Sequence, residues 1–150
     1  MSEKKDLGEK LRRRIAEVGS DAPGSIADLM NFQFVSCDYE QDNVVMTCET
    51  MPWMRNPAGT LHGGLCATIL DQAMGFVSYC LKPGEGTAPA VQLSVNYHRP
   101  LHPGEQVIVK VHAASVTRSL MNLTAEAYQA SRPEKICLSG SGIYFYKPNE

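Results

Sequence analysis

Residues 56–82 constrain the fold more than any other segment, because they predict a polar, glycine-rich loop followed by one long buried helix. From Gly63 onward, at ~100° of rotation per residue, the apolar side chains form one stripe on the helix surface. Such a stripe is typical of a helix packed on a hydrophobic core. The apolar stripe comprises Leu65, Cys66, Ile69, Leu70, Ala73, Phe76, Val77, Cys80 and Leu81, and the opposite face carries Thr68, Asp71, Gly75 and Ser78.

Segments with strand-like alternation of apolar and polar residues flank this helix. Strands on both sides of one buried helix predict an α+β fold, in which an antiparallel sheet packs one face against the helix. The other face and the edges of such a sheet are left open, which favours pairing with a second copy. The expected strands are 32–39, 44–49, 91–97, 107–112, 120–129 and 136–146.

The first residues predict a separate, smaller element. Residues 3–18 have the apolar spacing of a short amphipathic helix, and a turn with Pro23 and Gly24 follows. We therefore expect an N-terminal helix and turn over residues 1–24 and one domain over residues 25–150. The arginines at 12–14 are expected to form a solvated face, with contact to an anionic ligand as the alternative.

Two features of the central helix suggest a reaction site. Gly63 begins the helix, where unpaired backbone N–H groups carry partial positive charge and can stabilise an oxyanion. Asp71 is the only acid of the helix, and Gly75 leaves space beside it. Eight residues separate Gly63 from Asp71, which is about 12 Å of helix rise. Both groups can act on one atom only if two antiparallel copies of the helix share the site across a two-fold dimer.

The loop, the helix and a later strand together resemble a known family. They are similar to the hotdog-fold acyl-CoA thioesterases, in particular the PaaI-like branch of the 4-hydroxybenzoyl-CoA thioesterase superfamily. The resemblance extends over roughly residues 25–147. It implies a sheet wrapped around the central helix, an acyl-CoA substrate, and a homodimer assembled into a tetramer as a dimer of dimers. It rests on Asn56, Gly59, His62, Gly63, Gly64, Asp71 and residues 91–100.

Four residues are predicted to be catalytic. Asp71 would act either as a nucleophile that forms an acyl-enzyme anhydride or as a general base that activates water, and the sequence does not choose between them. The N–H of Gly63 would bind the oxyanion. The resemblance implies that His62 orients this loop and that Asn56 positions the water or the carbonyl. For Asn56, an ordinary loop cap is the alternative.

Five further residues are predicted to bind the substrate or its coenzyme A moiety. Relatives often carry Ser or Thr where this chain has Ala90, so the assisting hydroxyl is missing unless Ser94 or Thr68 replaces it. Cys66 as a nucleophile is disfavoured, because it lies on the apolar stripe, where a thiol stays protonated. The predicted binding residues are Gly64, Thr68, Ala90, Arg99 and Arg118.

Composition excludes other classes of protein. The net charge of −2 does not indicate nucleic-acid binding, and no apolar run is long enough to cross a membrane. The charged N-terminus lacks the apolar region of a secretory signal, and the five cysteines lack metal-ligand or redox spacing. We therefore expect a cytoplasmic protein with reduced cysteines, no metal, and no cofactor apart from coenzyme A as part of the substrate.

Two alternative functions remain open from the sequence. A hotdog dehydratase acting on hydroxyacyl thioesters would need a histidine and an acid at the β-hydroxyl. A non-catalytic acyl-CoA-binding domain would be consistent with the alanine at position 90. The acyl group of the substrate is not predictable, because side chains from several strands, in one subunit or in two, would set the depth of its pocket.

Overall fold

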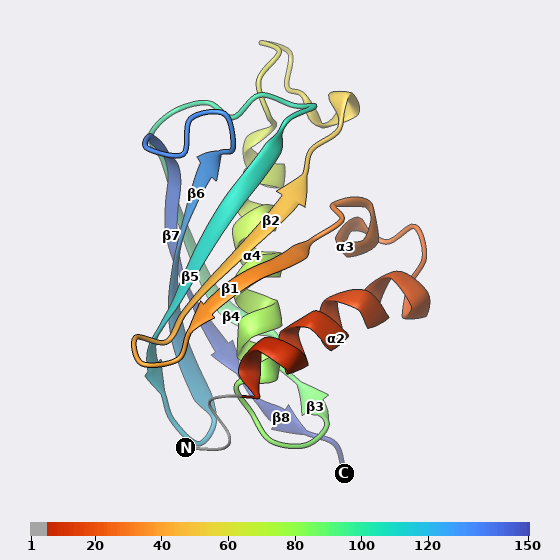
Figure 1. Ribbon diagram of the computed structural model, residues 1–150, viewed down its shortest axis with the longest axis vertical. Coiled ribbons are helices and arrows are strands. Elements are labelled where there is room, and N and C mark those ends of the chain that lie inside the picture. The colour runs from red at the N-terminus through yellow and green to blue at the C-terminus, as the bar shows by residue number, and fades with distance from the viewer. Residues whose placement is uncertain (1–5) are drawn as a thin grey trace.

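The computed structural model describes residues 6–150 and has the predicted α+β architecture (Figure 1). One long helix lies against a curved antiparallel sheet, and a shorter helix crosses that long helix. The helices are α2 (Leu7–Asp21), α3 (Ile26–Leu29) and α4 (Gly63–Cys80), with a 3-10 turn η1 (Pro52–Met54). The strands are β1 (Gln33–Asp38), β2 (Asn43–Glu49), β3 (Gly86–Thr87), β4 (Ala90–Tyr97), β5 (Gln106–Val116), β6 (Leu120–Gln129), β7 (Ile136–Phe145) and β8 (Lys147–Pro148).

The main sheet has the strand order β1-β2-β5-β6-β7-β4, and every neighbouring pair is antiparallel. Along β5 and β6 buried and open residues alternate, because one sheet face packs on α4 and the other faces outward. The hotdog arrangement expected from the resemblance is therefore confirmed. The small pair of β3 with β8 was not predicted.

Helix α4 packs closely against the sheet because the strands beneath it carry small residues. Ala125 and Ala127 of β6 and Gly142 of β7 face the helix as part of the buried layer. A Cβ atom on Gly140 would lie 2.9 Å from Leu70 Cδ1 and 2.6 Å from the backbone oxygen of Ser94. Glycine thus allows the helix and β4 to approach β7 at this point.

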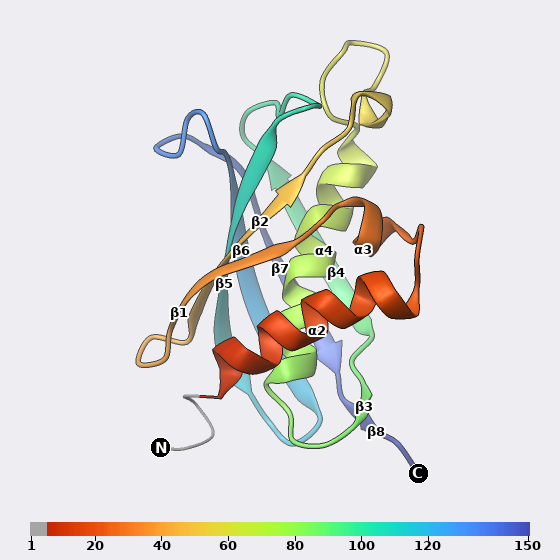
Figure 2. The ribbon, with the colours of Figure 1, turned by 45° about the vertical axis from the view of Figure 1, so that its right-hand side comes forward.

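The helix face opposite the sheet is only partly open, which corrects one expectation. Ser78 was expected on the open face, but its side chain is fully buried. Helix α2 crosses the C-terminal half of α4 and covers this region (Figure 2). The hydroxyl of Ser78 can be buried because it donates to the Met74 carbonyl at 2.7 Å. The N-terminal half of α4 stays outside this contact.

Helix α2 is anchored by both apolar and cationic side chains. Leu7 and Leu11 are buried in the common core, so the helix is an integral part of the structure. Arg12 stacks 4.9 Å from the Phe34 ring and Arg14 stacks 4.4 Å from the Tyr79 ring. Residues 3–5 of the expected helix 3–18 lie outside the described range.

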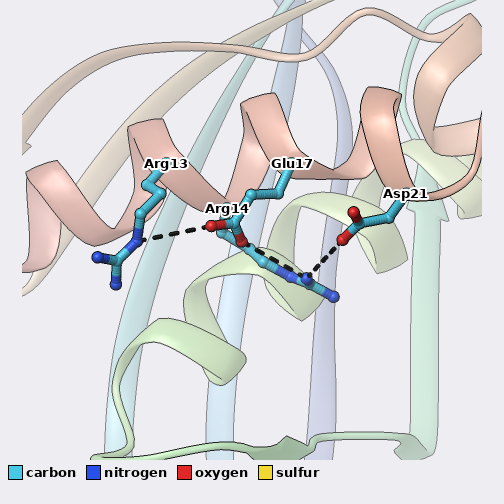
Figure 3. A network of polar contacts seen from close by, with 4 residues as sticks. All are labelled: Arg13, Arg14, Glu17 and Asp21. Atoms are coloured by element: carbon cyan, nitrogen blue, oxygen red, sulfur yellow. Dashed lines mark ion pairs between the residues drawn. The ribbon is translucent and has the colours of Figure 1, made fainter.

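The arginines of α2 also pair with acids of their own helix (Figure 3). Arg13 lies 3.7 Å from Glu17, and Arg14 lies 3.9 Å from Glu17 and 4.0 Å from Asp21. Such exposed pairs contribute little to stability, about 0–1 kcal/mol each. They do, however, neutralise much of the cationic charge, which agrees with a solvated face better than with an anion site.

The two edges of the main sheet differ in how they are protected. Edge strand β1 packs against α2 and has a register shift between Phe34 and Ser36. Edge strand β4 is exposed along nearly its whole length, including 60% of Val91 and 57% of Tyr97. An open edge strand with apolar side chains is a template for pairing with another chain.

Candidate active site

The beginning of α4 is organised around the His62-Gly63-Gly64 triplet. His62 is the N-cap, and its Nδ1 accepts a hydrogen bond from the Gly64 N–H at 3.0 Å. Its own N–H donates to the Met54 carbonyl at 2.8 Å. His62 therefore joins the preceding loop to the first turn of α4, and the Gly64 N–H is engaged in the cap.

The N–H of Gly63 stays available. Among residues 6–150, this group has no hydrogen-bond acceptor, while the Gly63 carbonyl accepts from the Tyr97 hydroxyl at 2.7 Å. The Tyr97 ring lies beside Gly63, where an added Cβ would be 3.5 Å from the hydroxyl oxygen. A free amide at a helix N-terminus is suited to bind an oxyanion.

Asn56 closes the loop that precedes α4. Its Nδ2 donates to Thr60 Oγ1 at 2.8 Å, and its Oδ1 accepts from the Thr60 N–H at 3.1 Å. Gly59 has φ of 86°, a left-handed conformation that favours glycine, and donates to the Asn56 carbonyl. The geometry favours the loop-cap role for Asn56, although one N–H of its amide remains free for a ligand.

Asp71 has one oxygen held and one oxygen open. The Tyr144 hydroxyl lies 2.8 Å from Asp71 Oδ1 and donates to it. The other carboxylate oxygen has no hydrogen-bond partner among residues 6–150. Every buried side-chain nitrogen or oxygen in this range does have a partner, so this oxygen is exposed to solvent. The carboxylate is thus fixed in position and accessible from outside.

The space beside Asp71 is open, as the glycine one turn later predicted. A Cβ atom on Gly75 would meet no heavy atom within 4 Å. Gly75 and Gln72 line a groove of ≈ 530 Å³, whose other walls come from α2 and the segment 86–89. A ligand or a second protein chain can therefore approach this face of α4.

Asp71 and Gly63 do not meet within one protomer. Both lie on α4, separated by eight residues of regular helix, or about 12 Å along its axis. The Asp71 side chain is held from the sheet side by Tyr144, and the Gly63 N–H points out of the helix N-terminus. A single chain therefore supplies the two halves of a site at separate places.

The hydroxyl beside Asp71 comes from Tyr144, which was not among the predicted site residues. Thr68 donates its hydroxyl to the Gly64 carbonyl at 2.9 Å, so this group is engaged within the helix. Ala90 pairs with Tyr144 across β4 and β7. Because a tyrosine at a buried strand position has the pattern of a core residue, no sequence pattern indicates its contact with Asp71.

The two arginines expected near coenzyme A lie at opposite ends of the protomer. Arg99 follows β4 and donates to the Ile136 carbonyl at 2.8 Å, two residues after Tyr97, whose hydroxyl contacts the first residue of α4. Arg118 lies in the β5–β6 turn, where its carbonyl accepts from Lys82 at 3.2 Å, just past the C-terminal end of α4. The two side chains cannot bind one phosphate within a single chain.

The cysteines have the properties of core residues. All five are free, and burial raises the pKa of Cys66 to about 11. At neutral pH this thiol is protonated, which argues against a role as nucleophile. Among residues 6–150 no group of His, Cys, Asp or Glu side chains could hold a metal ion, and no helix is long and apolar enough to cross a membrane.

Comparison with known proteins identifies relatives in sequence. Over 67 residues the chain is 34% identical to acyl-coenzyme A thioesterase 13 of Mus musculus. This match covers 43% of the chain and 46% of that protein, so the chain spans about half the length of the curated relatives it matches.

Comparison with solved structures identifies the same fold. The PaaI protein from the phenylacetic acid degradation operon of E. coli has a TM-score of 0.76 at 16% identity, covering 95% of this chain and 97% of that one. The smu.793 protein of Streptococcus mutans UA159, solved bound to acetyl CoA, has a TM-score of 0.67 at 21% identity, covering 79% and 90%.

The match to a family model is the more specific finding. The model of the thioesterase superfamily matches residues 58–136, which include most of the loop, α4 and the strands β4, β5 and β6 of the main sheet. The resemblance noted from the sequence is confirmed by this match. The chain belongs to the thioesterase superfamily.

Proposed function

We propose that this protein is a cytoplasmic acyl-CoA thioesterase that hydrolyses its substrate to a free acid and coenzyme A. The observation that carries the proposal is the Asp71 carboxylate, which is held on one oxygen by Tyr144 and open on the other. The free amide of Gly63 supplies the second requirement, a donor for the oxyanion. The acyl-CoA thioesterase among the curated relatives and the acetyl CoA bound to a structural neighbour support the substrate class.

Two routes can use the Asp71 carboxylate. In one, the carboxylate attacks the thioester carbonyl carbon, the C–S bond breaks, coenzyme A leaves as a thiolate, and water then hydrolyses the anhydride. In the other, the carboxylate takes a proton from water, which attacks the carbonyl, and the proton passes to the leaving thiolate. In both routes negative charge develops on the carbonyl oxygen, where the Gly63 N–H would stabilise it.

The proposed site is shared between two protomers. Asp71 of one protomer would face Gly63 and Asn56 of its partner, because one helix cannot bring these groups together. The open edge of β4 supports such a dimer, since it presents unpaired backbone groups and exposed apolar side chains. Assembly of two dimers into a tetramer is part of the same proposal.

The alternatives receive less support from the contacts. The hydrogen bonds that histidine rings make within residues 6–150 are with Gly64, Ser139 and Asn43, so no histidine ring there pairs with an acid as a dehydratase would need. Binding without turnover is favoured by the absence of a hydroxyl at Ala90. The Tyr144 hydroxyl on Asp71 weakens that argument.

Thiol release tests the proposed function. The purified protein is incubated with saturated acyl-CoA substrates of increasing chain length, none of which carries a hydroxyl group, and free coenzyme A is measured with a thiol reagent. We expect release with at least one chain length, which also identifies the acyl group. Tight acyl-CoA binding without release would contradict hydrolysis and select the binding-domain alternative.

Charge placed on the β4 edge is expected to separate the dimer. Val91→Lys puts an ammonium group where 60% of the valine is exposed, and two such groups would repel across a paired edge. We expect monomers by analytical ultracentrifugation and a loss of thioesterase activity. Val35→Lys is the matched control, because it places the same charge at a 51% exposed valine on the opposite edge strand, β1. If both variants form dimers to the same extent as wild type, pairing through β4 is contradicted.

A further inference from the structure

Tyr144 makes two contacts with one residue. Its hydroxyl lies 2.8 Å from Asp71 Oδ1 and 3.2 Å from the Asp71 backbone oxygen. A single O–H group that contacts both the side chain and the main chain of one residue restricts the rotation of that side chain. The contact joins β7 to α4, elements that are 73 residues apart in sequence at these positions.

The position of the Tyr144 ring is fixed by its surroundings. The side chain is 1% exposed, and its ring passes over Gly142 so closely that a Cβ there would lie 2.6 Å from Tyr144 Cε2 and 3.2 Å from the hydroxyl oxygen. Burial and the neighbouring Asp71 carboxylate both raise the pKa of Tyr144 above its ordinary value. The hydroxyl is therefore protonated at neutral pH and acts as a donor.

We propose that Tyr144 is a positioning residue, which holds Asp71 Oδ1 so that the other carboxylate oxygen points toward the open face of α4. This inference rests on the proposed function, in which Asp71 reacts with the thioester or with water. A side chain that is held in one rotamer loses less conformational freedom when the reaction geometry is reached. Tyr144 itself does not contact the reacting atoms.

Tyr144→Phe removes the hydroxyl and keeps the ring. We expect kcat for acyl-CoA hydrolysis to fall roughly 10- to 100-fold, because a hydrogen bond to a charged group is lost, while KM stays within about twofold. A purely structural role would instead lower the thermal stability and the fraction of active protein, without a selective effect on kcat. Tyr128→Phe is the matched control, since the Tyr128 hydroxyl also donates to a carboxylate, that of Glu126, on an exposed part of the sheet. Its kcat should equal that of wild type.

A crystal structure of Tyr144→Phe tests the positioning without turnover. We expect the Asp71 side chain in more than one rotamer, with a single rotamer in the wild-type crystal. An unchanged kcat in a folded Tyr144→Phe, or an Asp71 rotamer identical to that of wild type, would overturn the assignment. If wild type releases no thiol, the proposed function fails, and the rotamer comparison alone then decides whether Tyr144 positions Asp71.

Discussion

Asp71→Asn is expected to lower kcat for acyl-CoA hydrolysis by roughly 10²- to 10⁴-fold while the protein stays folded. The amide cannot attack the thioester or accept a proton from water, so either proposed route is blocked. The fold should be retained because the amide oxygen of asparagine can still accept the hydrogen bond from Tyr144. Steady-state kinetics and thermal unfolding measure the two effects separately.

The control for this variant is a carboxylate elsewhere on the surface. Asp21→Asn removes an acid at the end of α2, where the only ion pair found within the described residues is a 4.0 Å contact with Arg14. Its kcat should match wild type. Full activity of Asp71→Asn would remove Asp71 from the mechanism, even if the protein proved to be a thioesterase.

Gly63→Pro is expected to lower kcat roughly 10²- to 10³-fold by removing one backbone N–H. Proline is tolerated at the first position of a helix, because the N–H there has no intrahelical acceptor. The preceding residue, His62, has φ of −58° and ψ of 133°, a conformation compatible with a following proline. The substitution therefore removes the proposed oxyanion donor with little disturbance to α4, which circular dichroism can verify.

Gly63→Ala separates the loss of the amide from the addition of bulk. It keeps the N–H, and its Cβ would lie 3.5 Å from the Tyr97 hydroxyl oxygen, an ordinary contact. We expect Gly63→Ala to keep most of the wild-type kcat. Similar losses in the alanine and proline variants would indicate that space at Gly63, rather than its N–H, is what matters.

Much of the fold was predictable because it follows from local patterns. The apolar stripe of residues 63–80 and the alternation in β5 and β6 each identify the buried face of an element directly. Ser78 shows the limit of this reasoning. Its burial depends on α2, which crosses α4 through contacts that no spacing within residues 63–80 reveals.

The candidate site was predictable only in part, for a similar reason. Asp71 and Gly63 lie on one helix, so sequence spacing alone gives their separation. Tyr144 reaches Asp71 only because the sheet curves around α4 and Gly142 leaves room for the ring. The role of Asn56 is local, since its side chain hydrogen-bonds to Thr60 four residues later. These bonds explain an asparagine at this position without any ligand.

The most direct test of the shared site combines the two inactive variants in one dimer. The Asp71→Asn and Gly63→Pro variants carry different affinity tags and are co-expressed, and dimers with both tags are isolated. If each site uses Asp71 of one protomer and Gly63 of its partner, every mixed dimer has one intact site and one doubly defective site.

A randomly mixed population should then regain about a quarter of wild-type activity, since half of its dimers are mixed and half of their sites are intact. Purified mixed dimers should reach about half of wild-type activity by the same count. Activity no higher than that of the two parent variants, in dimers shown to contain both tags, would contradict a site shared between protomers.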